Sequence, residues 1–149
     1  MGNYWLKIIG ANQAELLDIY IKQIRSVLEF TAVVWHAGLT IENTYNIERV
    51  QKSALTIILG KSYRSYEDAL LLTGLDRLST RRITLCAQFA KKAAQNPRHK
   101  SWVVANQNET QTRRRPKLFK EALTRTNRLE RSTLPYFTNL LNLSSDRTN

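Results

Sequence analysis

Residues 16–60 read LLDIYIKQIRSVLEFTAVVWHAGLTIENTYNIERVQKSALTIILG. Two runs in this stretch repeat apolar residues at i, i+3, i+4 and i+7, which is typical of one face of an amphipathic helix. The first face comprises Leu16, Ile19, Tyr20, Gln23, Ile24, Val27, Leu28 and Thr31, and the second comprises Ile47, Val50, Gln51, Ala54, Leu55, Ile58 and Leu59. Gly60 follows the second run, where a left-handed residue commonly ends a helix. The pattern predicts a helical hairpin.

The ends of these two helices carry recognisable capping signals. Asn12, with Glu15 three residues later, predicts a capping box that opens a first helix over residues 13–34. Asn43 or Thr44 is expected to cap the second helix. The first helix should therefore run unbroken for most of the segment that precedes the polar connection.

Further helices are expected after the hairpin. Ser65, with Asp68 at the third position, predicts a short helix that stops near Gly74. Another helix opens around Ser79 and ends at Asn96, because a residue before proline disfavours the α region. Pro135 is well placed near the start of a short terminal helix. We predict an all-α fold: a hairpin and further short helices in a small, incomplete bundle, with a partly irregular basic C-terminal segment.

The charge is distributed unevenly along the 149 residues, whose formal net charge is +11. Residues 1–60 carry five basic and five acidic side chains, residues 61–100 nine and three, and residues 101–149 nine and four. The composition predicts a helical domain over 1–97, a basic polar linker over 98–117 and a C-terminal helical extension over 118–149. Such asymmetry indicates an apolar platform followed by an anion-facing portion.

Independent catalysis has no support in the sequence. It contains no glycine-rich phosphate loop, metal-ligand spacing or nucleophile–base arrangement, so no catalytic residue, metal or cofactor is predicted. Cys86 is interpreted as a buried thiol, and His36 as a helix-terminal histidine. No apolar run approaches the ~20 residues that span a bilayer, so no membrane partner is expected. We expect an intracellular protein, with nucleus and cytoplasm not distinguished.

A basic helical surface remains as the candidate site. Lysine and arginine side chains neutralise phosphates and release counterions, so binding to a nucleic-acid backbone should weaken with salt. The candidate phosphate-binding residues are Arg81, Arg82, Lys91, Lys92, Arg98, Lys100, Arg113, Arg114, Arg115 and Lys117. Trp102, Tyr63 and Tyr66 are candidates for stacking on bases. A merely solvated basic face is an equally good interpretation of the charge alone.

Several segments, taken in order, resemble a known family. They are IYIKQIRSVLEFTAVVWHAGLT, IERVQKSALTIILG, SYEDALLLTGLDRLSTRRITLCAQFAKKAAQNPRH and RTNRLERSTLPYFTNLLN. Together they are similar to the C-terminal part of the reverse transcriptase polyprotein of non-LTR, jockey-like retrotransposons. The resemblance covers residues 4–142. It implies that residues 1–97 are a helical thumb that grips a template–primer duplex, RNA or RNA–DNA, without sequence preference.

One departure from that family bears on activity. The family's RNA-directed DNA polymerase centre has two adjacent aspartates, and no Asp-Asp pair occurs in this sequence. We therefore expect a fragment of a transposable element that lacks the catalytic palm, against which Trp5, Leu6 and Ile8 would pack. Two alternatives stay open: a helical module for protein–protein interaction or structure, and a non-functional relic of the element.

Overall fold

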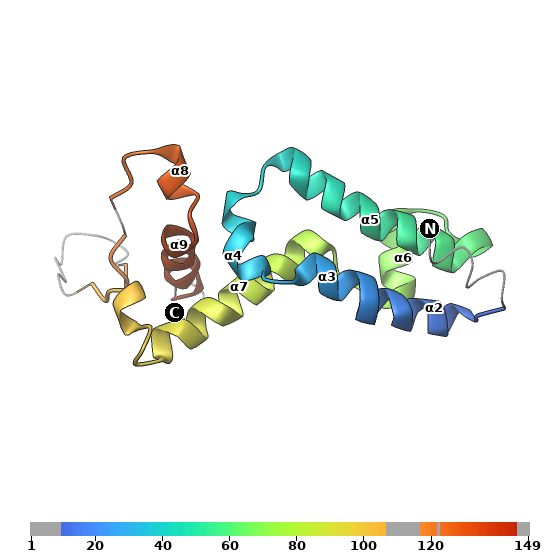
Figure 1. Cartoon of the computed structure of the whole chain (residues 1–149), viewed down its shortest axis with the longest axis horizontal. Helices are drawn as coiled ribbons and strands as arrows, with labels where there is room; N and C mark the ends of the chain where they lie inside the picture. Colours follow the sequence, from blue (N-terminus) through green and yellow to red (C-terminus); the bar gives the residue numbers. More distant parts are fainter. Residues whose placement is uncertain (1–9, 107–116, 122, 146–149) are drawn as a thin grey trace. The chain divides into compact units, whose positions relative to one another are not determined.

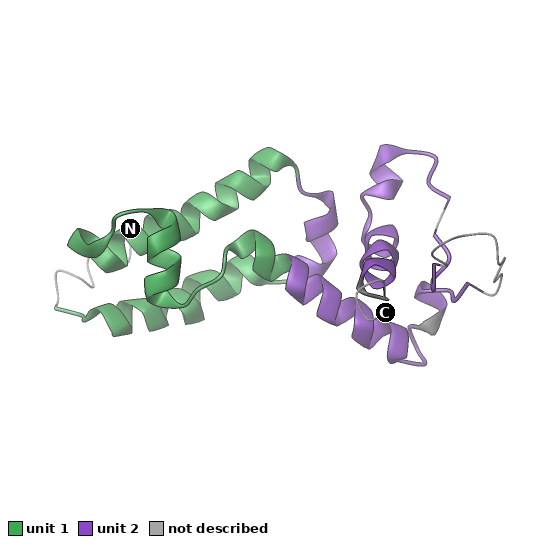
Figure 2. Ribbon diagram, turned by 180° about the vertical axis from the view of Figure 1, so that it is seen from behind, with its two compact units in different colours: residues 1–31, 40–82 green, residues 32–39, 83–149 purple. Residues whose placement is uncertain are grey.

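The computed structural model describes residues 10–106, 117–121 and 123–145. These residues are mostly helical, with no β-strand among them beyond one isolated antiparallel bridge between Ala105 and Phe119 (Figure 1). The predicted all-α class is confirmed. The chain forms two compact units: unit 1 holds residues 1–31 and 40–82, and unit 2 holds residues 32–39 and 83–149 (Figure 2). The domains assigned by composition, 1–97, 98–117 and 118–149, stay a prediction.

Unit 1 consists of helical segments, the first three of which follow one another without a break. In chain order they are α2 (Gln13–Ile19), the π-helical η1 (Tyr20–Arg25), α3 (Ser26–Glu29), α5 (Ile41–Leu59), the 3-10 turn η3 (Gly60–Ser62) and α6 (Tyr66–Thr73). The next helix, α7 (Leu78–Gln95), begins in unit 1 and passes into unit 2 after Arg82.

The first helix begins as predicted and ends earlier than predicted. Asn12 accepts a hydrogen bond on Oδ1 from the backbone N–H of Glu15 at 2.9 Å, and its own N–H donates to the Glu15 carboxylate at 3.0 Å. The expected continuous helix over 13–34 is wrong, because Thr31 takes a left-handed φ of +50°. That conformation costs a non-glycine residue about 1–2 kcal/mol. The next residue, Ala32, is buried with unit 2, so packing there overrides the helical pattern.

The π-helical segment also changes which face of this helix is buried. A π turn holds one more residue than an α turn. The residues that follow it therefore face a different direction from the one that a regular α-helix would give them. Leu16 and Tyr20 are buried as expected, whereas Val27 is 71% exposed. Arg25 and Glu29 take the more inward positions, and their side chains are only 15% and 13% exposed.

The second helix, α5, starts before the predicted caps. Thr40 is the N-cap, and its hydroxyl accepts a hydrogen bond from the N–H of Asn43 at 3.1 Å. The prediction of Asn43 or Thr44 was wrong, because both residues already have helical neighbours on either side and Thr40 alone has the extended backbone of a cap. Gly60, with φ +53°, ends the helix as predicted.

A third helix closes the hairpin of unit 1. α6 is capped by Ser65, whose hydroxyl accepts from the N–H of Asp68, and it ends at the left-handed Gly74, both as predicted. Its buried residues Ala69 and Leu70 belong to the same core cluster as buried residues of α2, η1 and α5. The resulting core comprises Leu16, Tyr20, Ala54, Leu55, Ile58, Leu59, Ala69 and Leu70. Each large apolar side chain in it contributes about 1.5–3 kcal/mol.

Polar contacts complete the interior of unit 1. The buried Tyr20 hydroxyl donates to Oε1 of Gln51 at 2.8 Å, and the Gln51 amide donates to the carbonyl of Asp76 at 2.9 Å. The carboxylate of Glu48 accepts from the Tyr66 hydroxyl at 2.5 Å and from the first backbone N–H groups of α7, at 3.2 Å each. A carboxylate is favoured there because a helix N-terminus carries partial positive charge.

Unit 2 is built around the rest of α7 and the terminal helix. Its other segments are α4 (Ala32–Trp35), the 3-10 turns η2 (His36–Gly38) and η4 (Lys100–Trp102), α8 (Asn127–Glu130) and α9 (Thr133–Ser145). The core contains Cys86, Ala90, Val103, Phe137 and Leu141. Cys86 is a buried free thiol, as expected. The terminal helix is also confirmed, with Pro135 in its first turn.

A side-chain amide joins the segment around Phe119 to the terminal helix. Asn142 of α9 accepts from the N–H of Phe119 at 3.0 Å and donates to the Phe119 carbonyl at 3.2 Å. On its other side this segment pairs with residues 104–106, because Lys120 donates to Val104 and Asn106 donates to Leu118, each at 2.8 Å. The amide therefore extends a short backbone ladder.

Replacing Asn142 by Ala should release this segment. Both backbone groups of Phe119 lose their partner, so we expect unit 2 to lose about 1–3 kcal/mol of unfolding free energy and the Phe119 amide to lose protection. Hydrogen exchange at Phe119 and chemical denaturation measure the two effects. Asn139→Ala on the exposed side of the same helix is the control. Unchanged exchange at Phe119 would contradict the assigned contact.

Two tyrosines should make unit 1 sensitive to alkali. Burial raises the pKa of Tyr20 well above 10, with Arg25 opposing and Glu29 adding to the rise; burial and the hydrogen bond to Glu48 raise the pKa of Tyr66. In the folded chain both hydroxyls stay neutral. Their contribution to the free energy of unfolding is therefore complete below pH 10 and is lost as the pH rises above 10. Chemical denaturation at about pH 8 and at about pH 11 measures how much unfolding free energy is lost between the two. This loss should be smaller for Tyr20→Phe than for the wild type. The exposed Tyr45→Phe serves as control and should keep the wild-type loss.

Candidate nucleic-acid interface

The candidate phosphate-binding residues differ in their surroundings. Arg113, Arg114 and Arg115 lie outside the described residues, as does the side chain of Lys100. The other candidates are described, and they have different surroundings: two contribute to the framework, one is paired at the surface, and three are exposed. They are Arg81, Arg82, Lys91, Lys92, Arg98 and Lys117.

The two arginines at the start of α7 belong to the framework. Arg82 is fully buried, so its guanidinium is not presented to a ligand, and its prediction as a surface contact is corrected. Arg81 is partly exposed and its Nε lies 2.5 Å from the Glu29 carboxylate, which also lies 3.5 Å from Arg25. The sequence places two basic residues side by side at a helix start, and this spacing alone does not reveal which of them faces inward.

The exposed cations gather at the other end of α7. Lys91, Lys92 and Arg98 are exposed, and none of them forms an ion pair with a residue that the structure describes. Lys117 is also exposed, but its ammonium lies 2.5 Å from the Glu121 carboxylate. We use the name α7 corner for Lys91, Lys92, Arg98, His99 and Trp102. It is the part of the predicted surface whose cations have no carboxylate partner within the described chain.

Only one of the three candidate stacking residues is presented for stacking. The Tyr66 hydroxyl is held by Glu48, and the guanidinium of Arg77 lies 5.8 Å from the centre of the Tyr66 ring. Tyr63 packs against the core of unit 1 with its hydroxyl buried. Trp102 is 43% exposed and lies against His99, with ring centres 4.3 Å apart and planes at 28°.

Further exposed arginines belong to unit 2. Arg125, Arg128 and Arg131 flank or lie in the short helix α8, which Thr126 caps, and none forms an ion pair with a described residue. Only Arg128 lies within α8, so the signal in the sequence is the repeated arginine itself and not a shared helix face. They add to the positive charge of unit 2.

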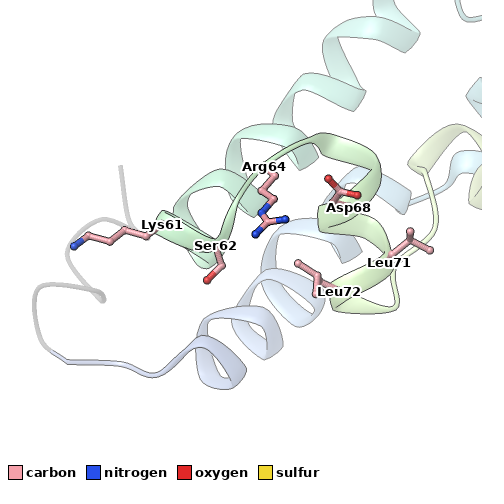
Figure 3. A pocket seen from close by; sticks show the side chains of 6 residues that line it. All are labelled: Lys61, Ser62, Arg64, Asp68, Leu71 and Leu72. Atoms are coloured by element: carbon pink, nitrogen blue, oxygen red, sulfur yellow. The ribbon is translucent and has the colours of Figure 1, made fainter.

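Unit 1 has a hollow of about 610 Å³ with mixed lining (Figure 3). Lys61, Ser62 and Arg64 come from η3 and the loop after it, while Asp68, Leu71 and Leu72 come from α6. Figure 3 shows Arg64 directed towards Leu72 and Lys61 directed away. The Asp68 carboxylate accepts from the Ser65 hydroxyl at 2.8 Å. With two cations and one carboxylate, the hollow is a weaker anion site than the α7 corner.

Comparison with known proteins adds no assignment: no family model, no curated protein and no solved structure matches the chain. Across the described ranges, no group of three or more His, Cys, Asp and Glu side chains is arranged to hold a metal ion. In the same ranges, every helix is too short or too polar to cross a membrane.

The different surroundings of Arg81 and Lys92 predict different mutational effects. Arg81→Met removes the closest partner of the mostly buried Glu29 carboxylate, so we expect a loss of about 1–2 kcal/mol of unfolding free energy. Lys92→Met removes an exposed, unpaired cation and should change stability by less than about 0.5 kcal/mol. Chemical denaturation measures both. Equal effects of the two substitutions would contradict the framework role of Arg81.

Proposed function

We propose that this chain binds the backbone of an RNA or RNA–DNA duplex without sequence preference, as the thumb-like part of a reverse transcriptase of the non-LTR retrotransposon kind. The observation that carries the proposal is the α7 corner, where Lys91, Lys92 and Arg98 are exposed without a carboxylate partner in the described chain. An excess of positive charge on a surface attracts a polyanion and speeds its association.

A structural role for these cations accounts for only part of their charge. A helix C-terminus carries about half a negative elementary charge, which a nearby lysine compensates. Lys92 lies in the last turn of α7 and suits that role. Lys91 and Arg98 then remain as surplus, and the exposed Arg125, Arg128 and Arg131 increase the surplus within unit 2.

Contact with the backbone is favoured over reading of base edges. A-form duplexes have a major groove too narrow for side chains to read, so proteins bind them through phosphates and 2′-hydroxyls. Long, flexible lysine side chains suit phosphates because they act as point charges and need no fixed orientation. The proposal therefore includes sensitivity to salt and indifference to sequence.

The sequence resemblance supplies the wider context of the proposal. The ordered segments between residues 4 and 142 support an origin in the C-terminal part of a retrotransposon polyprotein. The absence of an Asp-Asp pair supports binding without catalysis, since two-metal phosphoryl transfer needs carboxylates that converge on the ions. Incorporation of nucleotides by the purified chain in a primer-extension assay with magnesium would contradict this part.

A helical interaction module is the second candidate, and exposed apolar residues favour it. Ile41 is 92% exposed and Tyr45 is 64% exposed, and the two lie four residues apart on one side of α5. Val27 and Phe30 of unit 1 are also more than 70% exposed. Concentration-dependent self-association that Ile41→Lys abolishes would favour this candidate. A non-functional relic would show neither self-association nor duplex binding.

Reversing the charge of the α7 corner should weaken duplex binding. In the triple variant Lys91→Glu, Lys92→Glu, Arg98→Glu, up to three phosphate contacts are lost, so the slope of log K against log salt should become shallower by about 2–3. Fluorescence anisotropy with a labelled RNA–DNA duplex over a salt series measures affinity and slope together.

The matched control reverses three cations in unit 1. Arg49→Glu, Lys52→Glu, Lys61→Glu changes the net charge by the same amount and leaves the α7 corner intact. It should lose clearly less affinity than the corner variant. Equal losses would show attraction by bulk charge alone, and a folded wild-type chain that binds no duplex at low salt would overturn the proposal.

A further inference from the structure

We propose that Trp102, supported by His99, is a stacking site for an unpaired nucleobase next to the phosphate-binding cations of the α7 corner. This inference rests on the proposed function and narrows its ligand to a duplex that carries a single-stranded end. Base stacking on an aromatic side chain tolerates any sequence, in keeping with backbone-directed binding.

Successive backbone hydrogen bonds fix the position of Trp102 relative to the end of α7. The N–H of Asn96 donates to the carbonyl of Lys92 at 3.1 Å, that of His99 to Asn96 at 3.0 Å, and that of Trp102 to His99 at 2.9 Å. Arg98 is held in the same turn, because its N–H donates to the Asn96 side chain at 3.0 Å. The cations and the indole therefore belong to one continuous local structure.

The residues after Trp102 anchor it from the other side. Val103 is 4% exposed and packs in the core of unit 2 with Phe137 and Leu141. Val104 accepts the backbone hydrogen bond of Lys120. A stacking side chain on an anchored backbone loses less conformational entropy when it binds.

The indole is held on one face and accessible elsewhere. The His99 ring stacks on the indole with ring centres 4.3 Å apart, and Trp102 is still 43% exposed to solvent. The stacked imidazole supports the indole, and the exposed part of Trp102 offers aromatic surface to a ligand. Such a surface gains free energy when a base covers it.

The geometry selects unpaired bases. Inside a duplex both faces of a base are covered by its neighbours, and a terminal pair exposes one face. An overhanging or frayed base can present a face to Trp102 at the lowest cost, because no base pair restricts its orientation. Lys91, Lys92 and Arg98 are then available for the phosphates of the adjoining strand. In the competing interpretation, the His99–Trp102 pair has only a structural role and covers the end of α7. That role predicts no preference for one nucleic acid over another.

The test compares three labelled probes: a blunt RNA duplex, the same duplex with a short overhang, and the overhang strand alone. Trp102→Leu should lower affinity for the two probes with unpaired bases by roughly 5- to 150-fold, the range expected for one lost stacking contact. Affinity for the blunt duplex, which offers a base face only at its terminal pairs, should fall clearly less. Trp102→Phe keeps an aromatic face and should retain most of the preference.

Each other outcome has a defined meaning. Wild-type binding that is equal for all three probes and unaffected by Trp102→Leu overturns the stacking site and leaves the proposed function standing. Equal loss for all three probes also overturns it, because that points to a structural role. Absence of binding to every probe overturns the proposed function. Tryptophan fluorescence gives an independent readout: the overhang probe should quench the wild type more strongly than Trp102→Phe.

Discussion

The carboxylate of Glu48 joins α5 to the starts of α6 and α7 in unit 1, and the position of α7 depends on this junction. It accepts hydrogen bonds from the Tyr66 hydroxyl and from the backbone N–H groups of Leu78 and Ser79. One side chain of α5 thus meets the first turns of both α6 and α7. A helix N-terminus has unpaired donors and a partial positive charge, so an anion placed there satisfies both. The beginning of α7 is fixed by this contact.

The basic side chains of α7 divide according to where they lie along it. At its start, Arg81 is paired with Glu29 and Arg82 is buried, so the charges of these arginines are held within the fold. At its end, Lys91 and Lys92 are exposed without a described partner. One helix therefore carries both structural and surplus charge. Net charge alone does not separate the two kinds. The surplus charge is the reason that we propose a nucleic-acid partner ahead of a helical interaction module.

Unit 2 combines an exposed cationic end of a helix with an anchored backbone. The Asn142 amide and the ladder at Lys120 tie the chain on both sides of Phe119, and Val103 is fixed in the core. Trp102 and Arg98 are thereby presented from backbone that has its own hydrogen bonds. Proteins that bind nucleic acid without sequence preference commonly combine cations with a stacking platform in this way.

Local signals in the sequence determined the helical class and many of its boundaries. The capping box at Asn12, the cap at Ser65 and the left-handed Gly74 act over three or four residues, so they are readable without tertiary information. The spacing of apolar residues in α5 likewise determines which of its side chains are buried. The candidate cations were also named from the sequence, because the composition alone revealed the excess of charge.

Tertiary structure alone decided the break at Thr31, the inward position of Glu29 and the burial of Arg82. The pattern of residues 13–34 is helical throughout, but packing in two different units outweighs the cost of a left-handed threonine. A π turn then moved Val27 outward and Arg25 inward, since one extra residue per turn changes the phase of the helix. Which arginines are paired, and which aromatic ring stays exposed, depends on partners distant in sequence, and no local pattern specifies them.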